Sequence, residues 1–592
     1  MSGSGETSLK RRAVPKPGEA PLPAPNAAAL LRRNGTDPAI ANRPALRFAD
    51  RVWTHREFFA ESCRYANLFL ERAPADRALH VGVLLDNIPE YLFAFGGAAL
   101  SGSCIVGLNN TRRDEHLLRD AQHTHCGLLL TEPRHEALLA PVVEGLDLRP
   151  DDVLVATRFA DPDDPDPAVG VPLDDALAGY PDRDPGLEPS ADTLWTLIFT
   201  SGTSDAPKAV ITTQRRILVT GTRMGIIMDL GPDDTGYVCM PLFHSNAVMV
   251  GWAPSIVLGA SVGLARKFSA SRWLPDIRHY ASTYFNYTGK PLAYILSTPE
   301  QPDDADNPLR VAFGNEGSPD VVDRFSRRFG VDVIDAYGAT EGGVAVNRDA
   351  EERAGALGQA GPEVAVVDEE GNAKPAARFD DNGRLVNADE CVGEIVNTAG
   401  VGPFEGYYNN PDANERTMRF GWYWTGDLGY LDDDRYLYFA GRNADWIRVD
   451  GENFPAAPIE AALGHHPDVV LAVAYGVPDD QAGDQVMAGL VLRDGAVFDA
   501  AAFARWLDAQ ESIGPKWRPR YVRVLRDPPT TGTNKIVKRT LVHQKFRADR
   551  VAGDDIYVRG RGEDAYRPFT ASDESALAAS FRQYGRERFW DL

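Results

Sequence analysis

Residues 194–208 read LWTLIFTSGTSDAPK. The run 194–199 is mainly apolar and has the length of a strand, and hydroxyls, a glycine and a lysine follow it directly. Such a loop offers backbone N–H groups, hydroxyls and a positive charge to a phosphate. It lacks the GxxxxGKS or GxxxxGKT spacing, which disfavours a P-loop kinase. The stretch therefore predicts a buried strand leading into an anion-binding loop, although ordinary turns also contain these residue types.

Apolar runs of strand length recur on both sides of this stretch, with helix-like segments between them. The predicted strands are residues 81–85, 104–108, 127–131, 194–200, 236–240, 261–265, 309–313 and 331–335, and the predicted helices include 87–99 and 115–121. This alternation indicates parallel strands joined by crossover helices, which is an α/β fold. Ligands of such folds bind at the carboxyl ends of the strands, where the polar turns of this chain lie.

One further helix start is marked by its capping residues. Thr54 and Glu57 have the spacing of a capping box. Apolar residues follow at helical spacing, namely Phe59, Cys63, Ala66 and Leu70. We therefore expect an amphipathic helix that buries this face.

The composition narrows the class of protein. With 592 residues, the chain is longer than one hydrophobic core needs, so two to four domains are expected. A formal net charge of −23 argues against a nucleic-acid partner, which favours a basic surface. The cysteines form no CxxC pair and fit neither a disulfide framework nor a zinc site, so we expect a reducing cytoplasm. They are Cys63, Cys104, Cys126, Cys239 and Cys391.

The N-terminus and the longest uncharged run bear on targeting. Residues 1–25 are rich in Gly, Ser, Pro and Ala and lack the apolar segment of a signal peptide, so a disordered tail is expected. The uncharged run 91–108 is long enough to raise the question of a membrane span. Glycines interrupt it, which favours a buried helix followed by a strand. We expect no integral membrane segment.

A second motif, DAYGATEG at residues 335–342, follows the predicted strand 331–335. Tyr337 offers an aromatic face to a base, Thr340 a hydroxyl to a phosphate, and Glu341 a carboxylate to Mg²⁺. Taken alone, the motif is a weak signal, because these residue types are common in glycine-containing loops.

Two more motifs complete the set. WTGD at residues 424–427 puts Asp427 at an expected loop tip, where its carboxylate can accept from both hydroxyls of a ribose. Arg442 is a second candidate for the same sugar or for a phosphate. TGTNKIVKR at residues 531–539 presents Lys535 on a glycine turn. A surface ion pair and a solvated basic turn are the ordinary alternatives for these two motifs.

With PLFHSN at residues 241–246, these motifs resemble in order and spacing the adenylate-forming superfamily of acyl- and aryl-CoA synthetases, luciferases and peptide-synthetase adenylation domains. The resemblance covers residues 45–545. Shorter stretches are similar to the very-long-chain, fatty-acid-transport type of acyl-CoA synthetase, closest to actinobacterial ligases for fatty acids and steroid side chains. They are PLFHSNAV, GNEG at 314–317, VDGEN at 449–453, IYV at 556–558 and YRPFT at 566–570.

The resemblance implies an α/β fold with a large N-terminal domain, made of two α/β subdomains and a distorted β-barrel, and a small mobile α+β C-terminal domain. The expected divisions are a disordered tail at residues 1–28, an AMP-binding domain at 29–442, a mobile lid at 443–545 and an extension at 546–592. The hinge of this family lies just after Arg442, and the residue two positions past this arginine is usually Asp or Lys. Here that residue is Ala444, with Asp445 next, so the pivot is either shifted by one residue or tolerant of alanine.

The implied activity is that of an acid–thiol ligase using ATP, Mg²⁺ and coenzyme A. A carboxylic acid is activated as its acyl-adenylate, and the acyl group then passes to CoA. Lys535 would bridge the carboxylate and the α-phosphate, and His244 would lie beside the acyl carboxylate. Thr340 would hold the α-phosphate, and Glu341 would hold Mg²⁺.

The resemblance also assigns the nucleotide contacts. The phosphate loop would be Thr200, Ser201, Gly202, Thr203, Ser204 and Lys208. The adenine would be framed by Gly314, Asn315, Glu316 and Tyr337, and the further cofactor-binding candidates are Asp335, Ala336 and Gly338. The ribose would be held by Asp427 and Arg442. Candidate walls of the acyl pocket are residues 244–251, 287–290 and 313–316, where the small residues Ala247, Gly251 and Gly289 would leave room for a bulky acyl group.

One departure from the family pattern leaves alternatives open. Asp205 stands where the phosphate loop usually has glycine, and a carboxylate near a triphosphate should weaken ATP binding unless it reaches Mg²⁺ or water. A weakly active adenylate-binding protein is therefore one alternative. An acyl-AMP ligase that loads a separate carrier protein is another, although the chain has no carrier domain of its own. A homodimer and a peripheral membrane contact through a lipid-like substrate are compatible with the resemblance.

Overall fold

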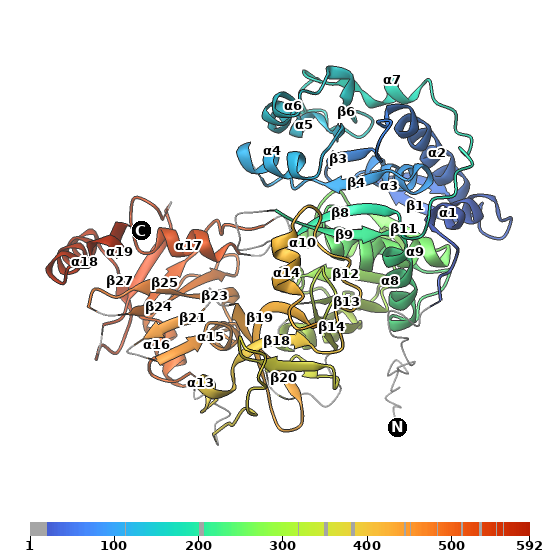
Figure 1. Ribbon diagram of the computed structural model, residues 1–592. Helices are drawn as coiled ribbons and strands as arrows, with labels where there is room; N and C mark the ends of the chain where they lie inside the picture. Colours follow the sequence, from blue (N-terminus) through green and yellow to red (C-terminus); the bar gives the residue numbers. More distant parts are fainter. Residues whose placement is uncertain are drawn as a thin grey trace.

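The computed structural model in Figure 1 has a large body and a smaller C-terminal domain beside it. The protein is mixed α/β, which confirms the predicted fold class. The described residues are 21–112, 114–200, 207–315, 317, 319–347, 353, 355–380, 385–442, 446–449, 452–481, 483–510, 513–531, 536–551, 553–560 and 562–591.

The first layer of the body is a seven-stranded sheet in the order β7-β6-β5-β3-β4-β8-β9. Its neighbours are parallel except for the antiparallel pair β8–β9 at one edge. Strands β3, β4, β5 and β6 are short, largely apolar and fully buried, as expected for a sheet covered on both faces. The seven strands are β3 (His80–Leu84), β4 (Cys104–Gly107), β5 (Leu128–Thr131), β6 (Val153–Val155), β7 (Val171–Pro172), β8 (Leu194–Thr200) and β9 (Lys208–Thr213).

The second layer is an eight-stranded sheet in the order β15-β14-β13-β12-β10-β11-β1-β2. Its central strands are parallel, and the outermost strand at each edge is antiparallel to its neighbour. The strands are β1 (Pro44–Phe48), β2 (Arg51–Thr54), β10 (Thr235–Val238), β11 (Ser261–Leu264), β12 (Tyr284–Thr288), β13 (Val311–Asn315), β14 (Asp332–Gly338) and β15 (Ala345–Asn347). All eight predicted strands are thus present, with ends that differ by up to three residues.

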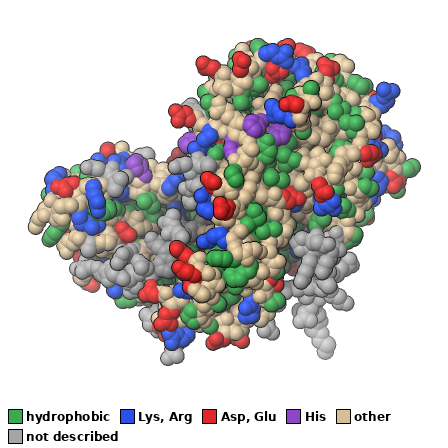
Figure 2. All heavy atoms as spheres, in the orientation of Figure 1, with side chains coloured by type: hydrophobic (Ala, Val, Ile, Leu, Met, Phe, Trp, Pro, Cys, Tyr) green, Lys and Arg blue, Asp and Glu red, His purple; other side chains and the backbone are tan. Residues whose placement is uncertain are grey.

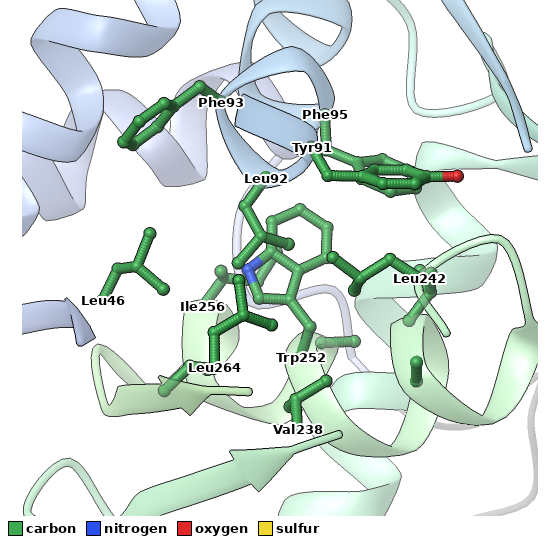
Figure 3. Close-up of a cluster of buried hydrophobic side chains, with 14 of the residues drawn as sticks. Leu46, Tyr91, Leu92, Phe93, Phe95, Val238, Leu242, Trp252, Ile256 and Leu264 are labelled. Carbon is green, nitrogen blue, oxygen red and sulfur yellow. The ribbon is translucent and has the colours of Figure 1, made fainter. Parts of the chain in front are cut away.

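The core lies between the two sheets, around helix α3 (Pro89–Ser101), which is buried along nearly its whole length. Figure 3 shows the stacked rings of Tyr91 and Phe95 above the indole of Trp252, with Leu92 and Leu242 beside it. The uncharged run 91–108 is therefore a buried helix followed by strand β4, as predicted. Within the described part of the chain, no helix is both long and apolar enough to cross a bilayer.

Other helices cover the two sheets and connect their strands, as crossover units require. They are α1 (Ala27–Thr36), α2 (His55–Arg72), α4 (Asp114–His123), α5 (Pro133–Glu136), α6 (Ala140–Gly145), α7 (Leu173–Leu177), α8 (Gln214–Ile227), α9 (Ala253–Leu258), α10 (Ala270–Tyr280), α11 (Pro291–Leu296) and α12 (Pro319–Phe329). Short 3₁₀ turns lie at η1 (Ala137–Leu139) and η2 (Pro150–Asp152), and a π-helix, η3 (Asn246–Trp252), precedes α9.

Two details of the N-terminal segment differ from the prediction. The predicted tail of residues 1–28 reaches into packed structure, because Leu22 and Ala24 contact the core, Asn26 caps α1, and Ala27 and Ala28 are fully buried. Residues 1–20 lie outside the described residues. The capping box of Thr54 and Glu57 is confirmed. Of the predicted buried face of α2, Cys63 and Ala66 are fully buried, which confirms these two positions. Phe59 and Leu70 are only half-buried, and the adjacent Phe58 and Phe69 are buried in their place. Apolar residues at adjacent positions made both registers compatible with the helical period.

Where we expected a distorted barrel, the structure has a five-stranded antiparallel sheet in the order β16-β20-β19-β18-β17. Its strands are β16 (Gly358–Gln359), β17 (Val364–Val367), β18 (Gly393–Asn397), β19 (Tyr423–Leu431) and β20 (Tyr436–Arg442). Helices α13 (Ala388–Cys391) and α14 (Pro411–Thr417) lie in its connections. This sheet joins the body to the small domain, as the yellow to orange colours of Figure 1 show.

The small domain combines a hairpin with a five-stranded sheet in the order β23-β24-β25-β26-β27. The strands are β21 (Trp446–Val449), β22 (Glu452–Pro455), β23 (Val469–Pro478), β24 (Asp484–Leu492), β25 (Tyr521–Val524), β26 (Asp555–Val558) and β27 (Arg567–Pro568). The helices are α15 (Ala457–Leu463), α16 (Ala500–Asp508), α17 (Lys538–Gln544), α18 (Ala571–Gln583) and α19 (Glu587–Asp591). Residues 546–592, the predicted C-terminal extension, thus supply the last two strands of this sheet together with α18 and α19.

A carboxyl group inside the body gives a test of the core. Glu90 is 2% exposed, and neither of its oxygens has a hydrogen-bond partner among the described residues. Burial raises its pKa from 4.5 to about 8, so the folded protein retains a proton that the unfolded chain releases. Folding stability attributable to this group is therefore present below pH 4.5 and is lost as the pH rises toward 8.

We predict that Glu90→Gln becomes progressively more stable than the wild type between about pH 4.5 and 8, reaching roughly a few kcal/mol at the upper end. Urea denaturation followed by fluorescence across this range measures the difference. Glu115→Gln on the exposed side of α4 is the control and should give no trend. A difference for Glu90→Gln that stays constant with pH would contradict the assignment.

Candidate functional site

The predicted phosphate loop is the connection of the β8–β9 hairpin. Thr200 ends β8 and lies opposite Lys208 at the start of β9. The tip between them carries Ser201, Gly202, Thr203, Ser204 and also Asp205, and it lies outside the described residues. The ammonium of Lys208 lies 5.4 Å from the centroid of the Tyr407 ring. The antiparallel pairing therefore brings the first and last residues of the loop together at the edge of the sheet.

The second and third motifs meet at the end of β14. The hydroxyl of Tyr337 donates to Oδ2 of Asp427 over 2.8 Å. Asp427 is 6% exposed and lies within strand β19, opposite Arg442 of β20, so the predicted loop tip is wrong. The glycine of WTGD suggested a turn, but the strand continues through it with Gly426 at φ +75° and a bulge two residues on.

Thr340 connects the second motif to PLFHSN. A hydrogen bond of 2.8 Å joins its hydroxyl to that of Ser245, the residue after His244. His244 is half-buried and closes a turn by donating its N–H to the carbonyl of Pro241. Asn87 holds this turn from the other sheet, accepting from the N–H of Leu242 over 2.9 Å and donating to a neighbouring carbonyl. These contacts place Thr340 and His244, two of the predicted catalytic residues, on adjoining loops.

Glu341 is buried, at 8% exposure, and accepts a hydrogen bond of 2.8 Å from the hydroxyl of Tyr407 on Oε1. Among the described residues, no basic side chain forms an ion pair with it. A buried carboxylate without a cationic partner is costly unless a cation completes the site. Its surroundings therefore suit a bound metal ion.

Arg216, near the start of α8, supports the same loop from beneath. Its guanidinium donates to the carbonyls of Thr340 and Glu341, the latter over 2.9 Å, and to the carbonyl of Ile211 over 3.0 Å. Burial lowers the pKa of Arg216, and the charges of Glu405 and Glu341 oppose that shift. The arginine thus fixes the backbone from which the side chains of Thr340 and Glu341 project.

Sequence reasoning missed Arg216, Tyr407 and a third residue, Tyr423. Burial and the charge of Glu341 raise the pKa of Tyr423, which is 2% exposed and also lies near Tyr337. Arg216 sits in a TTQRR stretch and Tyr407 in GYYNNP, and neither stretch has a spacing that marks a site. Their roles arise from contacts between segments far apart in the chain.

The predicted adenine residues gather at the ends of β13 and β14. Asp335 accepts on Oδ2 from the hydroxyl of Tyr287 over 2.7 Å and from the N–H of Gly317 over 2.8 Å. Asn315 donates weakly to the carbonyl of Gly338 at 3.4 Å, and its Oδ1 is a buried acceptor with no partner in the described part of the chain. Ala336 lies in β14 between these positions, and Glu316 lies outside the described residues.

Gly338 leaves open space at this edge. A Cβ added there would meet nothing nearer than the carbonyl of Val344 at 3.8 Å. A flat group with an exocyclic amine could therefore lie over the ends of these strands, with the Asn315 carbonyl as its acceptor.

The three predicted walls of the acyl pocket adjoin one another. Asn246 at the start of η3 donates to the carbonyl of Tyr287 over 2.9 Å, and Tyr287 pairs with Gly314 across β12 and β13. The expectation that small residues leave room for a bulky group is wrong at Gly251. A Cβ there would lie 2.6 Å from Oδ1 of Asn286, so this glycine admits the asparagine. A π-helix widens the turn at this place, as occurs at functional sites.

Two predicted residues, Lys535 and Arg442, are not brought into the site by the part of the chain that the structure describes. Lys535 and residues 532–534 lie outside the described residues, flanked by a bridge between Thr530 and Ile536. Arg442 is placed only by its backbone pairing with Asp427. Their roles stay predictions.

Family comparisons agree with this geometry. A family model described as "AMP-binding enzyme" matches residues 36–408, and one described as "AMP-binding enzyme C-terminal domain" matches residues 458–535. The chain belongs to the AMP-binding enzyme family. The first match contains the phosphate loop, His244, Thr340, Glu341 and Tyr407, and the second ends at Lys535.

Two curated relatives of this AMP-binding enzyme are named as a CoA synthetase and a CoA ligase. The chain is 44% identical over 563 residues to a steroid-22-oyl-CoA synthetase of Rhodococcus jostii, covering 95% of this chain and 98% of the relative. It is 45% identical over 497 residues to a medium/long-chain-fatty-acid–CoA ligase of Mycobacterium tuberculosis, covering 83% and 92%. Among solved structures, the anthranilate CoA ligase AuaEII with anthranoyl-AMP superposes with a TM-score of 0.75 at 22% identity, covering 89% and 98%. That likeness supports the fold.

The chemistry of the donors fits a nucleotide with its metal. Asn315 offers a buried acceptor to an adenine amine, Gly338 leaves space, and Glu341 offers a carboxylate without a cationic partner in the described region. Figure 2 shows acidic and basic side chains interspersed over the visible face of the body. Binding of an anion therefore depends on local donors and less on the overall field of an acidic protein.

We predict that Arg216→Met weakens AMP binding at least tenfold. Its loss leaves the buried carbonyls of Thr340 and Glu341 without their donor, which costs roughly 1–3 kcal/mol and displaces the loop. Isothermal titration of AMP measures the change. The neighbouring Arg215→Met, which removes only a surface ion pair with Asp192, is the matched control. Equal AMP affinities in the two variants would rule out the supporting role.

Proposed function

We propose that this protein is an ATP-dependent acyl-CoA ligase. It activates a carboxylic acid as its acyl-adenylate with release of pyrophosphate, and then transfers the acyl group to the thiol of CoA. The observation that carries the proposal is the cluster at the end of β14, where Thr340 and Glu341 adjoin Ser245 and Tyr407 beside the β8–β9 hairpin. Family membership and the named activities of the relatives support it.

The first half-reaction joins two anions, the substrate carboxylate and ATP, so their repulsion must be screened. Bound Mg²⁺, held by Glu341, would spread the charge of the phosphates. Lys208 and the hairpin loop would hold the β- and γ-phosphates, and Thr340 would donate to the α-phosphate. The carboxylate oxygen attacks the α-phosphorus, the bond to the bridging oxygen breaks, and pyrophosphate leaves.

Positioning of the nucleoside is proposed to follow from the buried polar groups around β14. Tyr337 and residues 314–316 would frame the adenine. Asp427, with Arg442, would hold the ribose, and the Tyr337 hydroxyl already fixes the orientation of the Asp427 carboxylate. A carboxylate fixed before the ligand binds loses less conformational entropy on binding.

Two residues are proposed to act on the acyl group. His244 would lie beside the acyl carboxylate, next to the Ser245–Thr340 hydrogen bond. Lys535 would bridge the carboxylate and the α-phosphate in the first half-reaction. In the second, the small domain would rotate about the segment after Arg442, and the CoA thiolate attacks the acyl carbon with AMP as the leaving group.

The proposed substrates are fatty acids or acids on a steroid side chain. Two relatives, at 44% and 45% identity, are named for a steroid-22-oyl group and for medium- and long-chain fatty acids. The acceptor is proposed to be CoA, as in the names of these ligases. A carrier protein as acceptor and a weakly active binding protein, suggested by Asp205, are outcomes that the experiment below distinguishes.

The protein is proposed to work in the cytoplasm, and its five free cysteines, all buried, fit a reducing compartment. A homodimer and a peripheral membrane contact stay predictions of the resemblance. Light scattering after size exclusion and flotation with lipid vesicles test them.

The function is tested by pyrophosphate release across short, medium and long fatty acids, a C24 steroid acid and aryl acids, each with and without CoA. We expect release with one aliphatic or steroid class, accompanied by conversion of CoA to its thioester. Release that yields thioester only on a carrier protein would point to the carrier-loading alternative. If no acid gives pyrophosphate release although ATP still binds, the binding-protein alternative is favoured. Asp205→Gly is then the variant to assay for a gain of activity.

We predict that Lys535→Ala lowers acyl-adenylate formation by roughly 10²–10³ while leaving thioester formation from supplied acyl-adenylate largely intact. Charge screening between the two reacting anions is needed only in the first half-reaction. Single-turnover assays of each half-reaction separate the effects. Lys516→Ala, at an exposed position of the same domain, is the control. A comparable loss in both half-reactions would remove Lys535 from its assigned role.

A further inference from the structure

Tyr407 is held rigidly where the body meets the antiparallel sheet. Its segment pairs with the outer edge of β9 through a bridge to Val210, with flanking backbone hydrogen bonds on either side. Asn414 accepts from the N–H of Tyr407 over 2.7 Å and donates to its carbonyl over 3.0 Å. The ring packs edge-on against Phe404 with centroids 4.9 Å apart. The side chain is 5% exposed, so its direction is set by packing and by the backbone.

This one side chain contacts two motifs that the chain places more than a hundred residues apart. Its hydroxyl donates to Oε1 of Glu341 over 2.8 Å. The face of its ring lies 5.4 Å from the ammonium of Lys208, within the range of a cation–π contact. Tyr407 therefore touches both the carboxylate suited to a metal and the lysine suited to a phosphate.

A carboxylate that binds a metal needs a fixed orientation. A glutamate side chain has three rotatable bonds, and the hydrogen bond from Tyr407 restrains the last of them. With Oε1 engaged, no hydrogen bond reaches Oε2 from the residues that the structure describes. Partners that orient a ligand in this way commonly contribute ten- to a hundredfold to metal affinity. Burial strengthens the hydrogen bond from Tyr407 to Glu341, because a hydrogen bond to a charged group is stronger in an environment of low dielectric constant.

We propose that Tyr407 is the positioning residue of the metal–triphosphate site. Its hydroxyl orients the carboxylate of Glu341 toward the divalent cation of the metal–ATP complex, and its ring holds Lys208 beside the phosphates. The inference rests on the proposed function, in which Glu341 binds the metal. Tyr407 itself touches no reacting atom, so its effect falls on ligands that carry a metal and spares those that do not.

The test uses Tyr407→Phe in the full-length protein, which keeps the ring and removes only the hydroxyl. Mn²⁺ serves as the probe, and its binding to the protein with ATP, in the absence of any acid, is followed by electron paramagnetic resonance. We expect Mn²⁺ to dissociate roughly tenfold more readily from the ATP complex of the variant. Binding of AMP without metal should be unchanged, which also shows that the variant is folded.

The adjacent tyrosine provides a matched control. Tyr408→Phe removes a hydroxyl that bonds His125, in the turn that follows α4. It should bind Mn²⁺ with ATP as the wild type does. A Tyr407→Phe variant that matches Tyr408→Phe in Mn²⁺ binding overturns the inference and leaves the ligase proposal standing. A wild-type protein that binds no Mn²⁺ with ATP overturns both.

A double-mutant cycle separates positioning from packing. In the Glu341→Gln background, Tyr407→Phe should cause little further loss of Mn²⁺ affinity, because the carboxylate it orients is gone. A further loss equal to that in the wild-type background would show that Tyr407 acts through something other than Glu341, and would also overturn the inference.

Discussion

The site depends on the placement of buried charges that are not paired directly with one another. Glu341 and Arg216 are both nearly inaccessible and lie close together, yet the arginine bonds backbone carbonyls and the carboxylate bonds a tyrosine. A direct ion pair would satisfy both charges but would also occupy the carboxylate. Three backbone carbonyls accept hydrogen bonds from Arg216, so its guanidinium is satisfied without an ion pair. The carboxylate of Glu341 therefore stays available to a ligand.

Parallel sheets make this arrangement accessible. The carboxyl ends of β13 and β14 lie side by side, so residues from both converge on one edge. The antiparallel pair β8–β9 of the other sheet carries the predicted phosphate loop. Asn87 joins the sheets by bonding the turn that precedes His244. The active edge is thus assembled from both layers of the body, while the small domain carries Lys535.

Much of this architecture was readable from the chain, because strand runs and contiguous motifs are local signals. β8 matches its predicted bounds, and Thr340 and Glu341 follow β14 as their motif indicates. The remaining contacts of the site depend on pairing between segments far apart in the chain. Tyr407 reaches Glu341 because its segment lies along β9, and no local spacing encodes that contact. The position of Asp427 was predicted wrongly for the opposite reason. The adjacent glycine indicates a turn locally, but pairing within the sheet keeps this segment in strand β19. The last strands of the small domain, β26 and β27, were also not predicted, because strands this short show little periodicity in the sequence.

The final strand of the small domain is only two residues long, Arg567–Pro568, and both are exposed. Proline has no N–H to offer, and the charged arginine discourages a second chain from adding itself to the sheet. Together with β26, this short strand covers the edge of β25, which would otherwise present a row of unpaired backbone groups. The C-terminal residues therefore shield the edge of β25, and a chain that ended before them would leave that edge open to pairing with another strand.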